Sequence, residues 1–342
     1  MSKLSEDPRI DPRLKALFGE LDLPPSPNFA SREEVLAEAN SEEAVAMRAG
    51  LADFLAMSDT EEIAPSDGLT ITTETFVSSP DGNTINVQMI VPDSDEPLPG
   101  VYYIHGGGMA SMSCYDGNYK AWGRIIAQNG VAVAMVDFRN CVTPSSAPEV
   151  EPYPAGLNDC VAGLKWVSAN ADSLGIDASR IIIAGESGGG NLTLATGMKL
   201  LRDGDIGLVQ GLYALCPYIA GSWPRDDLPS TIENNGILLD LHNNQGAMGY
   251  GIEAFEAEDP LAWPLFASSE DVMGLPMTVI SVNECDPLRD EGIAFYRLLL
   301  DAGQPARCRQ VMGTIHGTEV FPMACPDVSR DTARDLAALA IG

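Results

Sequence analysis

Ser187 lies in the segment GESGG, in which Gly185, Ser187 and Gly189 form the pattern Gly-x-Ser-x-Gly. The apolar run 180–185 precedes this segment and a helical stretch at 188–203 overlaps its end, so a strand, a tight turn and a helix are expected. Small residues around a serine permit a turn that exposes the hydroxyl above a sheet, and the helix N-terminus points its amides at the same place. This pattern favours a nucleophilic serine.

A glycine-rich turn before a helix can also bind phosphate, which is the first alternative for this segment. Phosphate-binding loops supply a Lys and a Ser or Thr after their glycines, whereas Asn191 and Leu192 stand here. We therefore rank the phosphate-binding interpretation below the nucleophile.

A second glycine-rich segment directly follows the apolar run 101–104. It consists of His105, Gly106, Gly107 and Gly108. Acyl transfer needs hydrogen-bond donors for a developing alkoxide, and unhindered glycine amides can provide them. We predict an oxyanion hole formed by the amides of Gly107, Gly108 and Gly188, and expect His105 to brace the loop. The alternative is an ordinary glycine-rich turn.

A serine nucleophile needs a base, and the chain has only three histidines. His105 belongs to the predicted oxyanion loop, and His242 lies in an irregular region. His316 stands between glycines, after an apolar run that ends near residue 312, which suits a loop at the carboxyl edge of a parallel sheet. We predict His316 as the base.

A carboxylate must hold the imidazole in one tautomer, and Asp286 is the predicted partner. It follows the run MTVISVNEC, and the chain order Ser187, Asp286, His316 is the order expected on a hydrolase sheet. Glu284 is the runner-up. The nearby acidic residues at 290 and 291 fall where a helix begins, so we expect them to cap it or to complement its dipole.

Short apolar runs alternate with helical stretches through most of the chain, which indicates βαβ units and a mainly parallel sheet. Two β-rich segments separated by Ser-Pro-Asp-Gly predict a hairpin at the start, over 69–79 and 83–92. The later apolar runs are 101–104, 131–138, 180–185, 208–215, 277–283 and 306–312. The helical stretches are 118–129, 155–173, 188–203, 290–302 and 327–340. The expected class is α/β, with roughly eight mostly parallel strands flanked by helices.

Two regions fall outside this alternation. Residues 1–66 are rich in charge and alanine and predict a helical N-terminal arm, with Ser31 near a helix start. Residues 217–264 lose the strand rhythm and are interpreted as an insertion over the active site that joins the arm as a helical cap. The alternative is an ordinary long loop with two helices. The catalytic domain is expected to span 67–342.

Composition limits the partners and the compartment. The 342 residues include 49 acidic and 20 basic ones, for a net charge of -29, which disfavours nucleic acid and anionic membranes. A surface adapted to high salt is an alternative interpretation of this charge. The seven cysteines form no C-x-x-C pair, so we expect reduced packing residues and no metal site. The start of the chain has no secretory pattern, which predicts a cytoplasmic protein.

The motifs together resemble the hormone-sensitive-lipase-like esterases, bacterial family IV of the α/β-hydrolase superfamily, over roughly residues 70–340. Besides HGGG and the serine turn, the segments 152–167 (PYPAGLNDCVAGLKWV), 286–292 (DPLRDEG) and 316–317 (HG) are similar to family segments. The resemblance implies an α/β-hydrolase fold, a Ser187, Asp286 and His316 triad, and an N-terminal cap over the acyl pocket. It also implies a carboxylic ester hydrolase that needs neither metal nor organic cofactor.

Two departures from the family pattern concern specificity. GESGG stands where many relatives have Asp or Thr before the serine and Ala after it, and residues 140–151 lengthen a usually short run. We expect Glu186 to buttress the turn and the longer run to reshape the pocket mouth. Five side chains either line the pocket or pack in the core. They are Met109, Tyr115, Tyr218, Trp223 and Trp263.

The predicted substrate is a small ester with a short acyl, aryl or acetyl group. The sequence contains no long apolar segment of the kind that forms a lid in enzymes acting at a lipid interface. An amidase or deacetylase with the same mechanism is an alternative. A different class is a non-catalytic small-ligand binding protein on the same fold, which the presence of His316 disfavours. An exposed edge strand near the end of the sheet would permit a homodimer.

Overall fold

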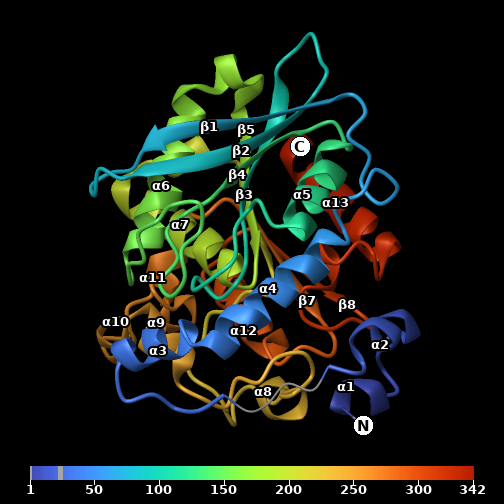
Figure 1. Cartoon of the computed structure of the whole chain (residues 1–342). Coiled ribbons are helices and arrows are strands. Elements are labelled where there is room, and N and C mark those ends of the chain that lie inside the picture. The colour runs from blue at the N-terminus through green and yellow to red at the C-terminus, as the bar shows by residue number, and fades with distance from the viewer. Residues whose placement is uncertain (1, 22–25) are drawn as a thin grey trace.

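One mixed sheet of eight strands runs through the part of the chain that the computed structural model describes, residues 2–21 and 26–342 (Figure 1). Its strand order is β1-β2-β4-β3-β5-β6-β7-β8. The strands are β1 (Leu69–Val77), β2 (Thr84–Pro92), β3 (Leu98–Ile104), β4 (Ala132–Val136), β5 (Ile176–Glu186), β6 (Gly211–Leu215), β7 (Met277–Asn283) and β8 (Ala306–Val311). Their positions confirm the predicted α/β class and the predicted strand number.

The sheet begins with the expected hairpin. β1 pairs with β2 in antiparallel register, with Leu69 opposite Pro92 and Val77 opposite Thr84. The amide of Ser78 closes the turn on the carbonyl of Asn83 at 2.8 Å. β2 is also antiparallel to β4, whereas all pairings from β4 to β8 are parallel. The carboxyl ends of the parallel strands therefore meet at one edge.

Helices cover both faces of the sheet, as the alternating sequence pattern predicts (Figure 1). The flanking helices are α5 (Gly117–Ala127), α6 (Ala155–Ala169), α7 (Gly188–Asp203), α12 (Arg289–Asp301) and α13 (Pro326–Ile341). Side chains of β3 alternate between the two faces: Tyr102 and Ile104 pack in a core with α6, α7 and α12, whereas Val101 and Tyr103 pack in a core with α5 and α13. Burial on both faces explains why the central strands are almost wholly apolar.

The N-terminal region divides into two parts. α1 (Lys3–Glu6) and α2 (Pro12–Phe18) pack in a third apolar cluster with residues that follow β8, including Ile315 and Cys325. α3 (Arg32–Ala39) begins at Ser31, whose side chain accepts from the amide of Glu34 at 3.3 Å, so the predicted helix start is confirmed. α4 (Glu42–Ala56) follows it. The helices of the region predicted as an N-terminal arm therefore pack in two different places.

The segment between β6 and β7, which includes the predicted insertion 217–264, contains four short helices and much irregular chain. They are α8 (Ser230–Glu233), α9 (Gln245–Tyr250), α10 (Ile252–Glu256) and α11 (Ser269–Val272). α3 contacts α9, and the amide of Phe29 donates to Asn244 at 2.8 Å, so the N-terminal region and the insertion are joined. Across residues 2–21 and 26–342, no helix combines the length and the apolar character that crossing a membrane requires.

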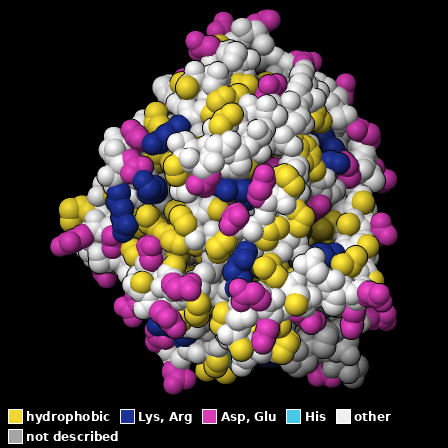
Figure 2. Space-filling view, turned by 60° about the vertical axis from the view of Figure 1, so that its left-hand side comes forward, with side chains coloured by type: hydrophobic (Ala, Val, Ile, Leu, Met, Phe, Trp, Pro, Cys, Tyr) yellow, Lys and Arg dark blue, Asp and Glu magenta, His cyan; other side chains and the backbone are white. Residues whose placement is uncertain are grey.

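Acidic side chains are spread over the molecular face seen in Figure 2, and basic side chains stand among them singly or in small groups. This distribution accompanies a net charge of -29. The visible face therefore presents no continuous basic surface of the kind that binds nucleic acid.

Candidate active site

Ser187 occupies a strained turn between β5 and α7. β5 ends at Glu186 and α7 begins at Gly188, while Ser187 itself has φ 58° and ψ −119°. A non-glycine residue in this conformation is costly and is typical of functional sites. The turn also requires a close approach of chains, because a Cβ atom on Gly189 would lie 2.0 Å from the carbonyl oxygen of Ile104. The strand, turn and helix predicted from the sequence are present.

The structure brings together the three residues predicted as the triad. His316 Nε2 lies 2.9 Å from Ser187 Oγ, and His316 Nδ1 lies 2.8 Å from Asp286 Oδ2. Asp286 follows β7 and His316 follows β8, so the parallel register of the sheet places both loops beside the end of β5. The second oxygen of Asp286 accepts from the amide of Leu288 at 2.9 Å, which fixes the carboxylate.

The environment of His316 favours a proton on its ring. Burial alone would lower the pKa of His316, but the charge of Asp286 and the hydrogen bond to it raise the pKa well above the ordinary value. An imidazole that can hold a proton in a buried site suits a base that accepts the serine proton and later returns it.

The rejected candidates for base and carboxylate have other partners. Glu284 accepts from the amide of Gly313 at 2.7 Å, and His242 Nε2 lies 2.9 Å from the carbonyl oxygen of Thr231. His105 is buried, stacks on Phe138 with ring centroids 4.4 Å apart and lies 2.9 Å from the carbonyl oxygen of Gly106. Burial lowers the pKa of His105, so the ring is neutral. These contacts agree with a brace for the loop.

The amides of Gly107, Gly108 and Gly188 are all free donors in the hydrogen bonding of the described chain. Gly107 has φ 89°, a conformation that favours glycine, and Gly188 approaches the oxyanion loop so closely that a Cβ atom on it would lie 2.5 Å from the amide nitrogen of Met109. Unpaired amides beside a nucleophile can bind a developing oxyanion.

Glu186 is buried beside the nucleophile and contacts two tyrosines. Its carboxylate accepts from Tyr119 Oη at 2.6 Å and from Tyr103 Oη at 3.1 Å. Burial raises the pKa of Glu186 to about 7, while the hydrogen bond from Tyr119 and the charge of His316 act in the opposite direction. The expected buttress is therefore also a titratable group at the site.

A cavity of about 340 Å³ opens above Ser187. Its apolar walls come from α4, from the insertion and from the segment after His316. These wall residues are Leu51, Leu55, Leu238, Leu239, Leu241, Val320 and Phe321. Both parts of the predicted cap therefore line the cavity, but in the N-terminal region only α4 does so, because α1 and α2 pack beside the end of β8.

Of the five side chains proposed for the pocket, Tyr218 lines it and the other four do not. Trp223 stacks on Tyr218 at 4.7 Å between ring centroids, and Trp263 meets Tyr218 edge-on at 5.5 Å, so both support the pocket wall from behind. Met109 is buried in the core below the loop. Tyr115 contacts Thr73 at 3.2 Å and faces a neighbouring cavity. For Met109, Trp223 and Trp263, packing was the correct alternative.

The sequence predicted the position of Glu291 at a helix start but not the partners of its carboxylate. This residue lies in the first turn of α12, as expected, but its buried carboxylate accepts from the amide of Ile219 at 2.6 Å and from Trp223 Nε1 at 2.8 Å. It therefore ties the segment behind Tyr218 to α12, a long-range contact that helix-start signals cannot reveal. The leucines of the pocket and Tyr119 were also missed, because they lie in segments with no catalytic motif.

Within the described ranges, one group of side chains is close enough to bind a metal ion, namely Cys216, Asp286 and His316. Two of these three are already joined by the 2.8 Å contact that also orients His316 toward Ser187. Their arrangement therefore suits proton transfer.

Several known proteins with related sequences are esterases. Residues 101–320 match the family model of the alpha/beta hydrolase fold. Carboxylesterase NlhH of Mycobacterium tuberculosis is 34% identical over 247 residues, which cover 71% of this chain and 73% of that protein.

Solved structures extend the likeness to nearly the whole chain. Esterase Est22 is 69% identical with a TM-score of 0.97, covering 99% of this chain and 100% of Est22. Brefeldin A esterase, a bacterial homologue of human hormone-sensitive lipase, is 37% identical with a TM-score of 0.85, covering 98% of this chain and 94% of that one. The chain therefore belongs to the hormone-sensitive-lipase-like family of the α/β-hydrolase fold and is a carboxylesterase.

Proposed function

We propose that the esterase reaction of this chain proceeds through an acyl-enzyme on Ser187, with His316 as base, Asp286 as its orienting partner and the amides of Gly107, Gly108 and Gly188 as the oxyanion hole. The supporting observation is the pair of contacts on His316, 2.9 Å to Ser187 Oγ and 2.8 Å to Asp286 Oδ2. Both ring nitrogens are thereby used as the mechanism requires.

In the first half of the reaction, His316 takes the proton of Ser187 while Oγ forms a bond to the ester carbonyl carbon. The carbonyl oxygen becomes an alkoxide and accepts from the three glycine amides. His316 then gives its proton to the departing alcohol oxygen, the ester C–O bond breaks, and the acyl group stays on Ser187. Water repeats the sequence and releases the acid.

The proposed substrates are esters with short acyl chains, including aryl esters. A cavity of about 340 Å³ with leucine walls suits a small apolar group. The structure of Est22 with p-nitrophenol supports an aryl alcohol as one leaving group. Initial rates with nitrophenyl esters of increasing acyl length test this preference, and a maximum at long chains would overturn it.

The mechanism is tested with Ser187→Ala, for which kcat on p-nitrophenyl acetate should fall by several powers of ten. Ser173→Ala provides a matched control, because Ser173 is exposed and precedes β5, whereas the catalytic turn follows the other end of that strand. A fluorophosphonate should label the wild type and the control, but not the Ser187 variant. Near wild-type turnover by Ser187→Ala would rule out the proposed nucleophile.

Two other functions share this site and make different predictions. An amidase or deacetylase should hydrolyse p-nitroacetanilide at a rate comparable with p-nitrophenyl acetate, whereas an esterase should prefer the ester strongly. A non-catalytic binding protein should bind esters without releasing acid and should resist the fluorophosphonate. The intact contacts of His316 favour the esterase over this second alternative.

We also propose a cellular compartment and an oligomeric state for the enzyme. All seven cysteines are free, six of them buried, which agrees with the reducing cytoplasm. β8 lies at one edge of the sheet, where a second copy of the chain can pair with it to form a homodimer. Sedimentation velocity on the wild type tests the dimer.

A further inference from the structure

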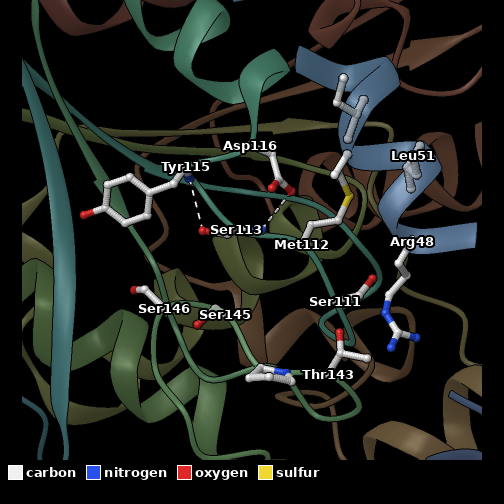
Figure 3. A pocket seen from close by; sticks show the side chains of 13 residues that line it. Arg48, Leu51, Ser111, Met112, Ser113, Tyr115, Asp116, Thr143, Ser145 and Ser146 are labelled. Atoms are coloured by element: carbon white, nitrogen blue, oxygen red, sulfur yellow. Dashed lines mark hydrogen bonds between the residues drawn. The ribbon is translucent and has the colours of Figure 1, made fainter. Parts of the chain in front are cut away.

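A second cavity, of about 490 Å³, lies beside the catalytic pocket (Figure 3). Three segments form its walls: α4, the loop after the oxyanion glycines, and part of the lengthened run 140–151. The lining residues are Arg48, Leu51, Ala52, Leu55, Ser111, Met112, Ser113, Tyr115, Asp116, Thr143, Pro144, Ser145 and Ser146. The proposed catalytic steps use none of these side chains.

The two cavities adjoin. Leu51, Leu55 and Met112 line both of them, so these side chains form the partition. Met112 has φ 75°, and its Cγ lies 3.0 Å from the position that a Cβ atom on Gly107 would occupy. The partition therefore includes an unbranched, flexible side chain that packs against the oxyanion turn and can adapt to a ligand.

The lengthened run is fixed to the oxyanion segment. The amide of Cys141 donates to the carbonyl of Met109 at 2.8 Å, and the amide of Thr143 donates to the carbonyl of Ala110 at 2.8 Å. The lengthened run 140–151 therefore forms one wall of the cavity, and backbone hydrogen bonds hold this wall against the oxyanion loop.

Two charged side chains with unused hydrogen-bonding capacity face this cavity. Arg48 donates through Nη1 to the carbonyl of Ala39, and in residues 2–21 and 26–342 no carboxylate lies within 4.0 Å of its guanidinium. Its Nε and Nη2 have no hydrogen-bond acceptor within the described chain. Asp116 Oδ2 accepts from the amide of Ser113 at 3.1 Å, and Oδ1 has no donor there. Figure 3 shows Arg48 on the helix side and Asp116 on the loop side, with Met112 between them.

We propose that this cavity is a second substrate chamber, which receives an ester arm containing a hydroxyl-bearing ring. Leucine, methionine and proline walls fit the faces of a ring, while Arg48 on one side supplies a donor and Asp116 on the other an acceptor, and a hydroxyl group can bond to either of them. A neutral arm is favoured over an anionic one, because the net charge of the protein is -29. This inference rests on the proposed function, since the chamber serves the same Ser187.

Matched esters test the chemistry of the chamber. Cyclohexyl acetate and 4-hydroxycyclohexyl acetate place the ring on the alcohol arm, and p-nitrophenyl esters of cyclohexanecarboxylic and 4-hydroxycyclohexanecarboxylic acid place it on the acyl arm. For one arm, kcat/KM of the wild type should be roughly tenfold higher for the hydroxylated ester, a factor equivalent to one charge-assisted hydrogen bond. Arg48→Met should reduce this preference at least threefold. Equal rates within both pairs would overturn the proposal.

Filling the chamber tests its location. Ala52→Trp places a large side chain in the chamber from an exposed position of α4, and Ala49→Trp places the same side chain on that helix outside the lining. The ratio of kcat/KM for the hydroxycyclohexyl ester to that for p-nitrophenyl acetate should fall at least tenfold in Ala52→Trp and stay at the wild-type value in Ala49→Trp. An unchanged ratio in Ala52→Trp would refute the proposal that this cavity receives part of the substrate. The proposed role of Ser187 is tested separately, because it would still hold if Ser187→Ala abolished hydrolysis in the same assays.

Discussion

Tyr119 links Glu186 to the oxyanion loop. Its hydroxyl donates to Glu186 Oε1 at 2.6 Å and accepts from the amide of Gly106 at 2.9 Å. The residue before the nucleophile is therefore connected, through one side chain of α5, to the first glycine of the loop that provides the free amides. A Cβ atom on Gly106 would lie 2.0 Å from Glu186 Oε1, so the loop and the carboxylate are also in direct contact.

We predict that Tyr119→Phe lowers kcat roughly 10- to 100-fold, because the loss of its hydroxyl frees the Gly106 amide and lets the oxyanion donors move. KM should change much less, since the ring that lines the cavity stays and only a hydroxyl already bonded to Glu186 and Gly106 is lost. Tyr103→Phe is the matched control. It removes the 3.1 Å contact with the same carboxylate but has no bond to the loop. Steady-state kinetics with p-nitrophenyl acetate checks both, and equal effects of the two changes would contradict the link.

Glu186→Gln should alter the pH profile of kcat/KM. Burial raises the pKa of Glu186 to about 7, and its negative charge above that pH favours the protonated form of His316. Removing the charge should lower the pKa of His316, so the acid limb of the profile should move to lower pH. Near pH 7 the acid limb of the wild-type profile should be shallower than a single titration, because protonation of Glu186 removes a charge that holds the proton on His316, whereas the variant should keep the slope of one.

The control for this pH measurement is Glu256→Gln, since Glu256 is exposed in the insertion. Its profile should follow that of the wild type. Profiles of Glu186→Gln and wild type that superimpose would show that the Glu186 charge does not act on His316.

The order of the elements could be predicted from the sequence because it depends on local patterns. The hairpin, the alternating runs and the helix after Ser187 all follow from periodicity, and a parallel sheet brings the ends of its strands to one edge. That rule is sufficient to place Asp286 and His316 near Ser187 without any knowledge of the contacts between them.

The pocket could not be predicted, because its walls depend on how the N-terminal region and the insertion lie across the sheet. The sequence left open whether the aromatic side chains line the pocket or pack in the core, and in the structure Trp223 and Trp263 are buried behind Tyr218. The leucines that do line it come from α4 and from irregular chain at 238–241. Amphipathic periodicity shows that a helix has an apolar face but does not show which surface that face covers.

Gly188→Ala should impair catalysis, because Gly188 lies against the oxyanion loop. In this structure the added Cβ would lie 2.5 Å from the amide nitrogen of Met109 and 2.8 Å from Cα of Gly108, so the oxyanion loop must move away. We expect kcat to fall about 10- to 100-fold with little change in the melting temperature. Gly207→Ala is the control, because open space surrounds that glycine. A wild-type value of kcat for Gly188→Ala would show that the oxyanion loop can move to accommodate the added Cβ atom without loss of activity.

Glu291→Gln should destabilise the fold. The carboxylate accepts from the amides of Ile219 and Ala220 and from Trp223 Nε1, at 2.6, 3.2 and 2.8 Å. A glutamine offers only one acceptor oxygen, and its NH₂ group would face a donor, so one buried donor loses its partner at a cost of about 1–3 kcal/mol.

The pH dependence of this effect has a defined sign. Burial raises the pKa of Glu291 to about 8 from an ordinary value of 4.5. The folded state therefore holds a proton that the unfolded state releases, so this group contributes stability that is present below about pH 4.5 and is lost as the pH rises toward 8. Urea denaturation of the wild type should show this decline in the free energy of unfolding between pH 5 and 8, and Glu291→Gln should show a smaller one. Glu253→Gln, on the exposed side of α10, should behave as the wild type. Equal declines in the wild type and Glu291→Gln would mean that the three donors hold the carboxylate ionised throughout this range.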